Sequence, residues 1–335
     1  MRINAAGFPG IATWVFNIEN TRLLHNRTLL LVLKSWKFWL GTALLLGLVW
    51  LVEAHYGWAN VAESWQTIEP RQLIIALALM LVSYLLRALR FYDFFGSYTK
   101  GQFTPLLRIT VLHNFFNNLL PMRSGEATFP LLMKQQYQVP YRHSGPALLW
   151  LRLLDLYVLL ALAFISLQSL MPWGEEIRYA LAGAVLAAPL LALVLQEMVR
   201  KHLQTGQGWK AKVLELMTAL PDNPFTFIRA LLWTIINWVV KLAVFSWLLS
   251  AFTGLTLSAS WSGATTGELS SVLPIHGLAG AGTYEAGVLA GLLPWGIESG
   301  PALAAAVNLH LFVLGSTFIL TGILTLATQR SVIKH

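Results

Sequence analysis

Residues 117–126 read NNLLPMRSGE, and residues 271–285 read SVLPIHGLAGAGTYE. Each stretch interrupts a long apolar region with proline, glycine and a glutamate. Irregular backbone and charge at membrane depth are tolerated only where protein or a wet cavity surrounds them. A matched pair of such breaks, one in each half of a chain, is the best sequence indication of a transport site.

The composition of the chain is that of a polytopic membrane protein. Of its 335 residues, 56% are hydrophobic and 11% are charged, whereas a soluble domain carries about 25% charged residues. The net charge is +8, but the basic residues are scattered among apolar segments, which favours positive-inside topology over nucleic-acid binding. The absence of cysteine excludes disulfides, thiolate catalysis and Cys-ligated metals. We expect no cofactor and no metal site.

Hydropathy predicts an all-α fold with about six transmembrane helices, since a span needs about 20 apolar residues. The predicted spans are roughly 36–54, 72–95, 145–170, 178–197, 226–252 and 301–328. Two further apolar regions, 103–133 and 256–295, contain the breaks, and each is predicted to be a re-entrant helical hairpin. We expect residues 1–35 to be a cytoplasmic or interfacial segment, 198–222 a cytoplasmic linker and 329–335 a cytoplasmic tail.

The charges between the spans predict the orientation of the chain. Basic and non-basic loops alternate if both broken regions return to the side from which they start, and residues 253–300 contain no Lys or Arg. The positive-inside rule then puts both termini in the cytoplasm, and we expect a multi-pass protein of the inner (cytoplasmic) membrane. Repeats 36–170 and 171–328 start on opposite faces, as in an inverted-topology repeat. If a broken region instead contains a true crossing, everything downstream is reversed.

The first break combines a helix breaker with groups that suit an anion. Pro121 cannot donate a backbone hydrogen bond, and it biases the preceding residue away from helix. The return half-helix would present its N-terminus to an anion such as phosphate, and Arg123 could pair with that phosphate bidentately. Alternatively, Glu126 only caps its own helix and Arg123 extends to the interface. The candidate residues here are Asn117, Asn118, Pro121, Arg123, Gly125 and Glu126.

The second break is richer in glycine, which allows close backbone approach to a ligand or to another helix. His276 could titrate near neutral pH or donate to a phosphate. Glu285 lies a few residues into the return half-helix, as Glu126 does in the first hairpin. The alternative is small-residue packing around a neutral or capped Glu285. The candidate residues here are Pro274, His276, Gly277, Gly280, Gly282 and Glu285.

Three charged residues inside the spans are further candidates. Arg152 and Asp155 are three residues apart, so they lie on one helical face and can pair. Such a pair could lock a span against a hairpin, or one member could change partner during transport. Lys241 could balance a glutamate or attract an anionic headgroup.

Other charged positions are given mainly structural roles. Glu268 is a weaker candidate at membrane depth, and we expect His310 to be a packing residue. Arg87, Arg90 and Asp93 end the second span on the cytoplasmic side, where we expect them to be topology anchors, with contact to a lipid headgroup as the alternative.

The motifs around these residues resemble the signatures of one family. The runs NNLLPMRSGEATFPLLMK and LLWLRLLDLYVLL, at 117–134 and 148–160, look like the first-half signature of the lysylphosphatidylglycerol synthase transmembrane-domain family. The run SVLPIHGLAGAGTYEAGVLAGLL, at 271–293, looks like its second-half signature. The resemblance covers roughly residues 35–328. It carries over the positions Pro121, Arg123, Gly125, Glu126, Arg152, Asp155, Pro274, Gly277, Gly280, Gly282 and Glu285.

The resemblance implies a membrane domain that moves lipids across the bilayer. Members with a cytosolic aminoacyltransferase domain make and flip aminoacylated phosphatidylglycerol, and others act with enzymes of polyprenyl-linked sugar or hopanoid metabolism. We expect this chain to be a stand-alone member without the synthase domain, so the family name does not describe its activity.

The favoured hypothesis is a flippase or scramblase for a phospholipid or a polyprenyl-phosphate-linked lipid. Because no nucleotide-binding motif is present, transport would be passive or coupled to a proton or cation. The expected partner is a membrane lipid, either anionic or polyprenyl-phosphate-linked, and a lipid-modifying enzyme is a further candidate. The competing hypotheses are an intramembrane enzyme that uses Glu126, Glu285 and His276 as acid–base groups, and an accessory subunit that transports nothing. The sequence contains no strong catalytic motif, which favours a protein that is not an enzyme.

Overall fold

The described part of the chain is entirely helical in the computed structural model. It comprises residues 36–203, 223–272 and 277–332, with a few isolated positions between 204 and 222, and none of these residues forms a strand. The predicted N-terminal segment and most of the predicted linker lie outside the described residues. The last helix continues to Val332, so the predicted tail lies mostly within it or outside the described residues.

The first half begins with two helices and a long span. Pro70 starts the long span because its fixed φ suits the first helical turn and it needs no intrahelical donor bond. Glu69 and Gln72 cap the same helix reciprocally. The elements are α3 (Trp36–His55), α4 (Trp58–Glu63), η1 (Ser64–Thr67), α5 (Pro70–Phe94) and α6 (Gly96–Thr99).

The first broken region forms a helical hairpin. Helix α7 (Phe103–Leu119) ends at Leu120, whose backbone is extended, as expected for a residue before proline. The 3₁₀ turn η2 (Pro121–Ala127) follows, and α8 (Thr128–Tyr137) packs back against α7. The chain then continues into α9 (Tyr141–Leu167) and η3 (Gln168–Leu170).

The second half repeats this order of elements. Helix α10 (Glu175–Leu203) bends by 45° after Pro189, and α12 (Pro224–Thr253) follows. The second broken region forms α13 (Leu257–Val272), η4 (Leu278–Gly280) and α14 (Thr283–Leu292), with α13 packed closely on α14. The chain ends with η5 (Leu293–Trp295) and α15 (Ser299–Val332).

Helices α13 and α14 approach through paired glycines. A Cβ at Gly291 would lie 2.5 Å from the Ser262 carbonyl oxygen, and a Cβ at Gly267 would lie 2.5 Å from Val288. Each helix carries two glycines four residues apart, at 263 and 267 and at 287 and 291. Small residues at this spacing let helix backbones pack closely in an apolar environment.

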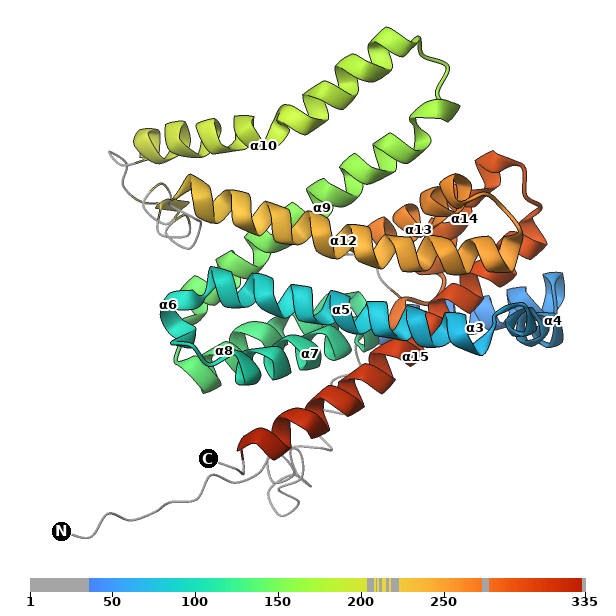
Figure 1. Cartoon of the computed structure of the whole chain (residues 1–335), viewed down its shortest axis with the longest axis horizontal. Helices are drawn as coiled ribbons and strands as arrows, with labels where there is room; N and C mark the ends of the chain where they lie inside the picture. Colours follow the sequence, from blue (N-terminus) through green and yellow to red (C-terminus); the bar gives the residue numbers. More distant parts are fainter. Residues whose placement is uncertain are drawn as a thin grey trace.

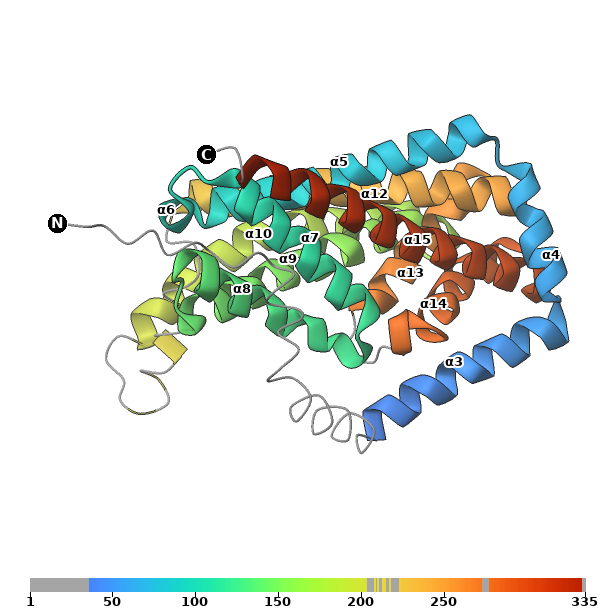
Figure 2. The same cartoon turned by 90° about the horizontal axis from the view of Figure 1, so that it is seen from below.

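The two hairpins begin and end at opposite ends of the molecule (Figures 1 and 2). The α7–α8 hairpin returns to the end that carries α6, and the α13–α14 hairpin returns to the end that carries α4. Helices α3, α9 and α12 run toward the α4 end, whereas α5, α10 and α15 run away from it (Figures 1 and 2). Each of these helices in the second half therefore runs in the direction opposite to that of its counterpart in the first half.

The described helices identify a polytopic membrane protein. Helices α5, α9, α12 and α15 are long and apolar enough to cross a membrane, and the bent α10 can count as a fifth. The remaining predicted span, 36–54, corresponds to α3, whose apolar part, Thr42–His55, is shorter than the other spans. Large apolar side chains such as Ile74 (67% exposed) and Leu186 (66%) face outward. Lipid would cover these side chains, since exposed apolar surface of this extent marks a membrane interaction.

Candidate functional site: a polar network between the two hairpins

The first break holds Glu126 against α9 and α7. One carboxylate oxygen of Glu126 lies 2.9 Å from Nε of Arg152, and the other lies 3.5 Å from Nε2 of His113. Gly125 permits this approach, because a Cβ there would lie 2.5 Å from backbone atoms of Phe116 and Asn117. The turn therefore packs directly on α7, and its glutamate faces a basic side chain.

Asp155 joins three helices at the centre of this cluster. Its carboxylate is fully buried and accepts hydrogen bonds from Arg90 at 2.6 Å, from the Trp238 indole at 3.0 Å and from Arg152 at 3.1 Å. A buried charge is stable only when it is paired and hydrogen-bonded. The predicted Arg152–Asp155 pair is thus present, and Arg152 extends it to Glu126 in the first hairpin.

Arg90 is not an interfacial anchor, so that part of the sequence interpretation is wrong. Its side chain is 1% exposed, and besides Asp155 it donates to Thr234 at 2.9 Å. The reason is packing: α7 and α12 pack against α5, and the Arg90 guanidinium meets Asp155 of α9 and Thr234 of α12 inside the bundle. Asp93, in contrast, lies near the surface and pairs with Arg229 at 3.1 Å.

Trp238 connects this cluster to a second one. Its indole donates to Asp155, while its ring lies 6.0 Å from the Arg87 guanidinium and 5.0 Å from the Lys241 ammonium. Cations at such distances are attracted by the face of an indole ring. One aromatic ring therefore holds two basic side chains, from α5 and α12, near each other.

The second cluster pairs Lys241 on α12 with Glu268 on α13. The ammonium lies 2.7 Å from the carboxylate, and Glu268 is almost fully buried. Lys241 thus balances the charge of a glutamate, which is one of the two roles predicted for it. Glu268 holds α13 against α12 in the same contact.

Glu285 and His310 tie the second hairpin to α15. One oxygen of Glu285 lies 2.6 Å from Nδ1 of His310, and the other accepts the backbone N–H of Gly282 at 2.8 Å. Nε2 of His310 lies 2.8 Å from the carbonyl oxygen of Ala279. A carbonyl only accepts, so Nε2 carries a proton, and a second proton lies between Nδ1 and Glu285. His310 is therefore a partner of the hairpin and more than a packing residue.

The turns of the two hairpins contact each other. The turn η2 contacts η4, and α7 also contacts η4. Figure 2 shows the end of α7 beside the second hairpin, with α3 running below both. Gly282 has φ +82°, and a Cβ there would lie 3.6 Å from Leu44 on α3. The breaks from the two halves of the chain therefore meet inside the bundle.

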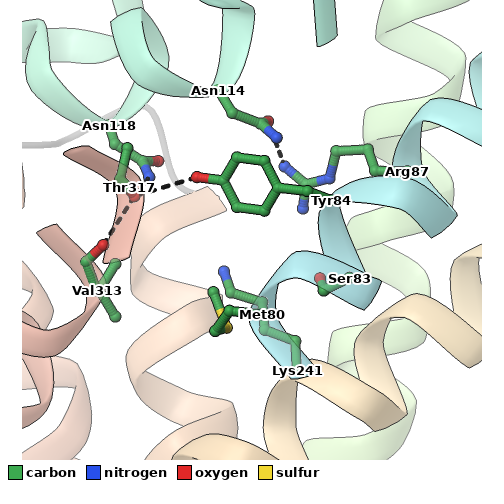
Figure 3. A pocket seen from close by; sticks show the side chains of 9 residues that line it. All are labelled: Met80, Ser83, Tyr84, Arg87, Asn114, Asn118, Lys241, Val313 and Thr317. Atoms are coloured by element: carbon green, nitrogen blue, oxygen red, sulfur yellow. Dashed lines mark hydrogen bonds between the residues drawn. The ribbon is translucent and has the colours of Figure 1, made fainter. Parts of the chain in front are cut away.

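A polar pocket lies beside this meeting point, between α5, α7, α12 and α15. Its volume is about 330 Å³, including the part open to its surroundings, and its interior has room for about one water molecule. Figure 3 shows Arg87 donating to Asn114, at 2.6 Å, and Tyr84 and Asn118 donating to Thr317. The pocket is lined by Met80, Ser83, Tyr84, Arg87, Asn114, Asn118, Lys241, Val313 and Thr317.

Comparison with known proteins identifies the family. Residues 38–321 match the family described as the lysylphosphatidylglycerol synthase TM region. The chain belongs to this family. No curated protein and no solved structure gives a match.

The predicted site residues of this lysylphosphatidylglycerol synthase TM region fall into three groups. Glu126, Arg152 and Asp155 form one connected cluster, and Lys241 and Asn118 line the pocket beside it. Glu285 lies in a separate pair with His310. Pro274 and His276 lie outside the described residues, as does the side chain of Arg123.

Sequence reasoning missed Arg90, His113 and the polar face of α5. Ser83, Arg87 and Arg90 follow one another at i, i+4 and i+7, on the face that buries Ala76 and Met80. From this spacing one could have predicted that Arg87 and Arg90 face the interior of the bundle. Asn114 likewise precedes Asn118 by one turn of α7.

Proposed function

We propose that this protein is a membrane lipid transporter, a flippase or scramblase for a phospholipid or a polyprenyl-phosphate-linked lipid. The observation that supports it is the contact between η2 and η4, beside a buried network of charged side chains. Broken helices that converge from two inverted repeats are the arrangement in which transporters place their substrate sites.

The energetic argument favours a role beyond packing. A charged side chain at the bilayer centre costs at least about 2.5–3.5 kcal/mol on insertion scales. The network contains four acids and four bases in Glu126, Asp155, Glu268, Glu285, Arg87, Arg90, Arg152 and Lys241. Apolar residues could hold the same helices together at lower cost. A polar route for a headgroup, with the lipid tails left in the bilayer, accounts for their presence.

Arg152 supplies a route to conformational change. It contacts Glu126 in the first hairpin and Asp155 in its own helix. Asp155 also has Arg90 as a partner, so Arg152 can release one carboxylate without leaving Asp155 unpaired. The first hairpin would then separate from α9 and open the interior. Such a step requires no nucleotide, in keeping with passive or ion-coupled transport.

The broken regions act in this proposal as re-entrant hairpins of the inner membrane, with both termini in the cytoplasm. The charge distribution supports the orientation. The C-terminus of α6, the N-terminus of α9 and the C-terminus of α10 lie at the same end of the molecule (Figures 1 and 2), and these segments carry Lys100, Arg142 and Arg200, whereas residues 253–300 contain no Lys or Arg. The α6 end is therefore assigned to the cytoplasm by the positive-inside rule.

A reconstituted liposome assay with a labelled lipid tests the proposal. The wild-type protein should move the lipid between leaflets without changing it chemically. Glu126→Gln should lower the rate at least about tenfold, because the hairpin cannot close again through the charge-assisted contact with Arg152, which is worth about 1.5–3 kcal/mol. Glu285→Gln should have an effect in the same direction, through its contact with His310.

Asp93→Asn is the matched control, since Asp93 pairs with the exposed Arg229 outside the network. It should transport the lipid at the wild-type rate. Full transport activity in both Glu126→Gln and Glu285→Gln would refute the mechanism in which the two hairpins form one site. A chemically altered headgroup would instead favour an intramembrane enzyme, and no movement by a well-folded protein that co-purifies with an enzyme would favour an accessory subunit.

A further inference from the structure

The pocket of Figure 3 has a lining that is unusual for a membrane interior. Two of its nine residues, Arg87 and Lys241, are basic, five are neutral and polar, and none is acidic. Its polar groups come from four helices: α5, α7, α12 and α15. Lys241 and Arg87 approach the space from two sides. The lining therefore offers positive charge and hydrogen-bond donors to whatever occupies it.

Among the described charged side chains of the network, Arg87 is the one without a direct ion pair. Asp155 pairs with Arg90 and Arg152, Glu126 with Arg152, Glu268 with Lys241, and Glu285 with His310. Among the described residues no carboxylate pairs with Arg87, whose hydrogen-bond partner is the neutral amide oxygen of Asn114. A partly buried cation without a direct ion pair favours binding of an anion.

We propose that this pocket binds the phosphate group of a headgroup with net negative charge, and that Arg87 discriminates such headgroups from zwitterionic ones. The inference rests on the proposed function, because it names the substrate class of the same interior. Arg87 exchanges the neutral oxygen of Asn114 for phosphate oxygens, and a guanidinium binds phosphate in a bidentate manner. Lys241, whose ammonium also contacts Glu268 at 2.7 Å, lines the same pocket and offers further N–H donors.

The same lining disfavours a cationic headgroup. An amine or a quaternary ammonium would meet Arg87 without an acidic side chain in the lining, because Glu268 already pairs with Lys241. Like charges in a medium of low dielectric constant repel strongly. The pocket has room for about one water molecule in this conformation, so Arg87 must move away from Asn114 when phosphate binds.

Ligand-induced stabilisation of the purified full chain in detergent tests the inference. Phosphatidylglycerol, phosphatidylcholine and inorganic phosphate are titrated separately, and an apparent Kd is obtained from the rise in Tm. Wild type should bind phosphatidylglycerol about tenfold or more tightly than phosphatidylcholine. If inorganic phosphate stabilises the protein and neither lipid does, the pocket still binds phosphate, but its ligand is the free ion and not a lipid headgroup.

Arg87→Gln should remove most of the preference for phosphatidylglycerol, and Arg87→Lys should retain part of it. Arg229→Gln removes an exposed arginine outside the pocket and should bind as wild type does. If Arg87→Gln does not fold, the partial loss of preference expected for Arg87→Lys still tests the assignment of Arg87. Equal binding of the two lipids by wild type, or an unchanged preference in Arg87→Gln, would overturn the assignment of Arg87.

The liposome assay separates this inference from the proposed function. Transport of phosphatidylglycerol and phosphatidylcholine at equal rates would refute the headgroup selection while the transport function stands. Selective binding of phosphatidylglycerol by a protein that moves neither lipid would refute transport while the phosphate site stands.

Discussion

Asp155 illustrates at the residue scale how the network depends on a single carboxylate. It accepts from Arg90, Arg152 and Trp238, which come from three helices. Asp155→Asn leaves the buried Arg90 without its counter-charge and removes one of the two carboxylates that pair with Arg152. We expect the free energy of unfolding to fall by about 3–5 kcal/mol, measured by chemical unfolding in detergent.

Asp93→Asn is the control for this change, since Asp93 and Arg229 form a surface pair whose partners are 27% and 55% exposed. Exposed pairs contribute about 0–1 kcal/mol because solvent screens them. If the two variants lose the same stability, the buried cluster does not hold the bundle together.

At the scale of the element, the α13–α14 hairpin depends on close helix packing. A Cβ at Gly291 meets the Ser262 carbonyl and the Thr266 side chain, and neither can move far within a helix. Gly291→Ala should therefore destabilise the protein by about 1–3 kcal/mol, as overpacking of a core does. Thermal unfolding in detergent would measure this.

Gly315→Ala provides the comparison in α15, where a Cβ would meet no atom within 4 Å. There the change should be neutral or slightly stabilising, since alanine is the better helix former by about 1 kcal/mol. A stabilising effect of Gly291→Ala would contradict the close packing of the second hairpin.

The elements were easier to predict from the sequence than their partners. Pro121 and the glycines around 280 act on their own backbone, so the positions of the breaks follow from local chemistry. The pairing of Glu285 with His310, 25 residues later, depends on how α14 packs on α15. Arg90 was misjudged for the same reason, because hydropathy places a residue along a helix but does not reveal which helices cover it.

For the whole molecule, the sequence predicted an all-helical bundle with two hairpins, and the described part of the chain is such a bundle. This prediction came from hydropathy and from the proline and glycine breaks, whereas the alternation of charged loops predicts the orientation of the chain. The pocket between α5, α7, α12 and α15 could not be predicted in this way. Its lining combines residues as distant as Met80 and Thr317, which only the packing of the two halves brings together.

The orientation of the two hairpins is a prediction for the whole molecule, and the chain is well suited to testing it because it contains no native cysteine. Single cysteines at Ser97 and Gln138 mark the ends of the first hairpin, and single cysteines at Thr256 and Glu298 mark those of the second. All four side chains are exposed. In oriented vesicles, a membrane-impermeant maleimide should label 97 and 138 from the cytoplasmic side and 256 and 298 from the other side.

The result depends on whether each broken region returns to the side from which it starts. A region that contained a true crossing would place its two cysteines on opposite sides of the membrane. If Ser97→Cys and Gln138→Cys were labelled from different sides, the orientation predicted for everything after α8 would therefore have to be reversed. Labelling of all four positions from one side would remove the inverted arrangement, and with it the reason for the two turns to meet within the membrane.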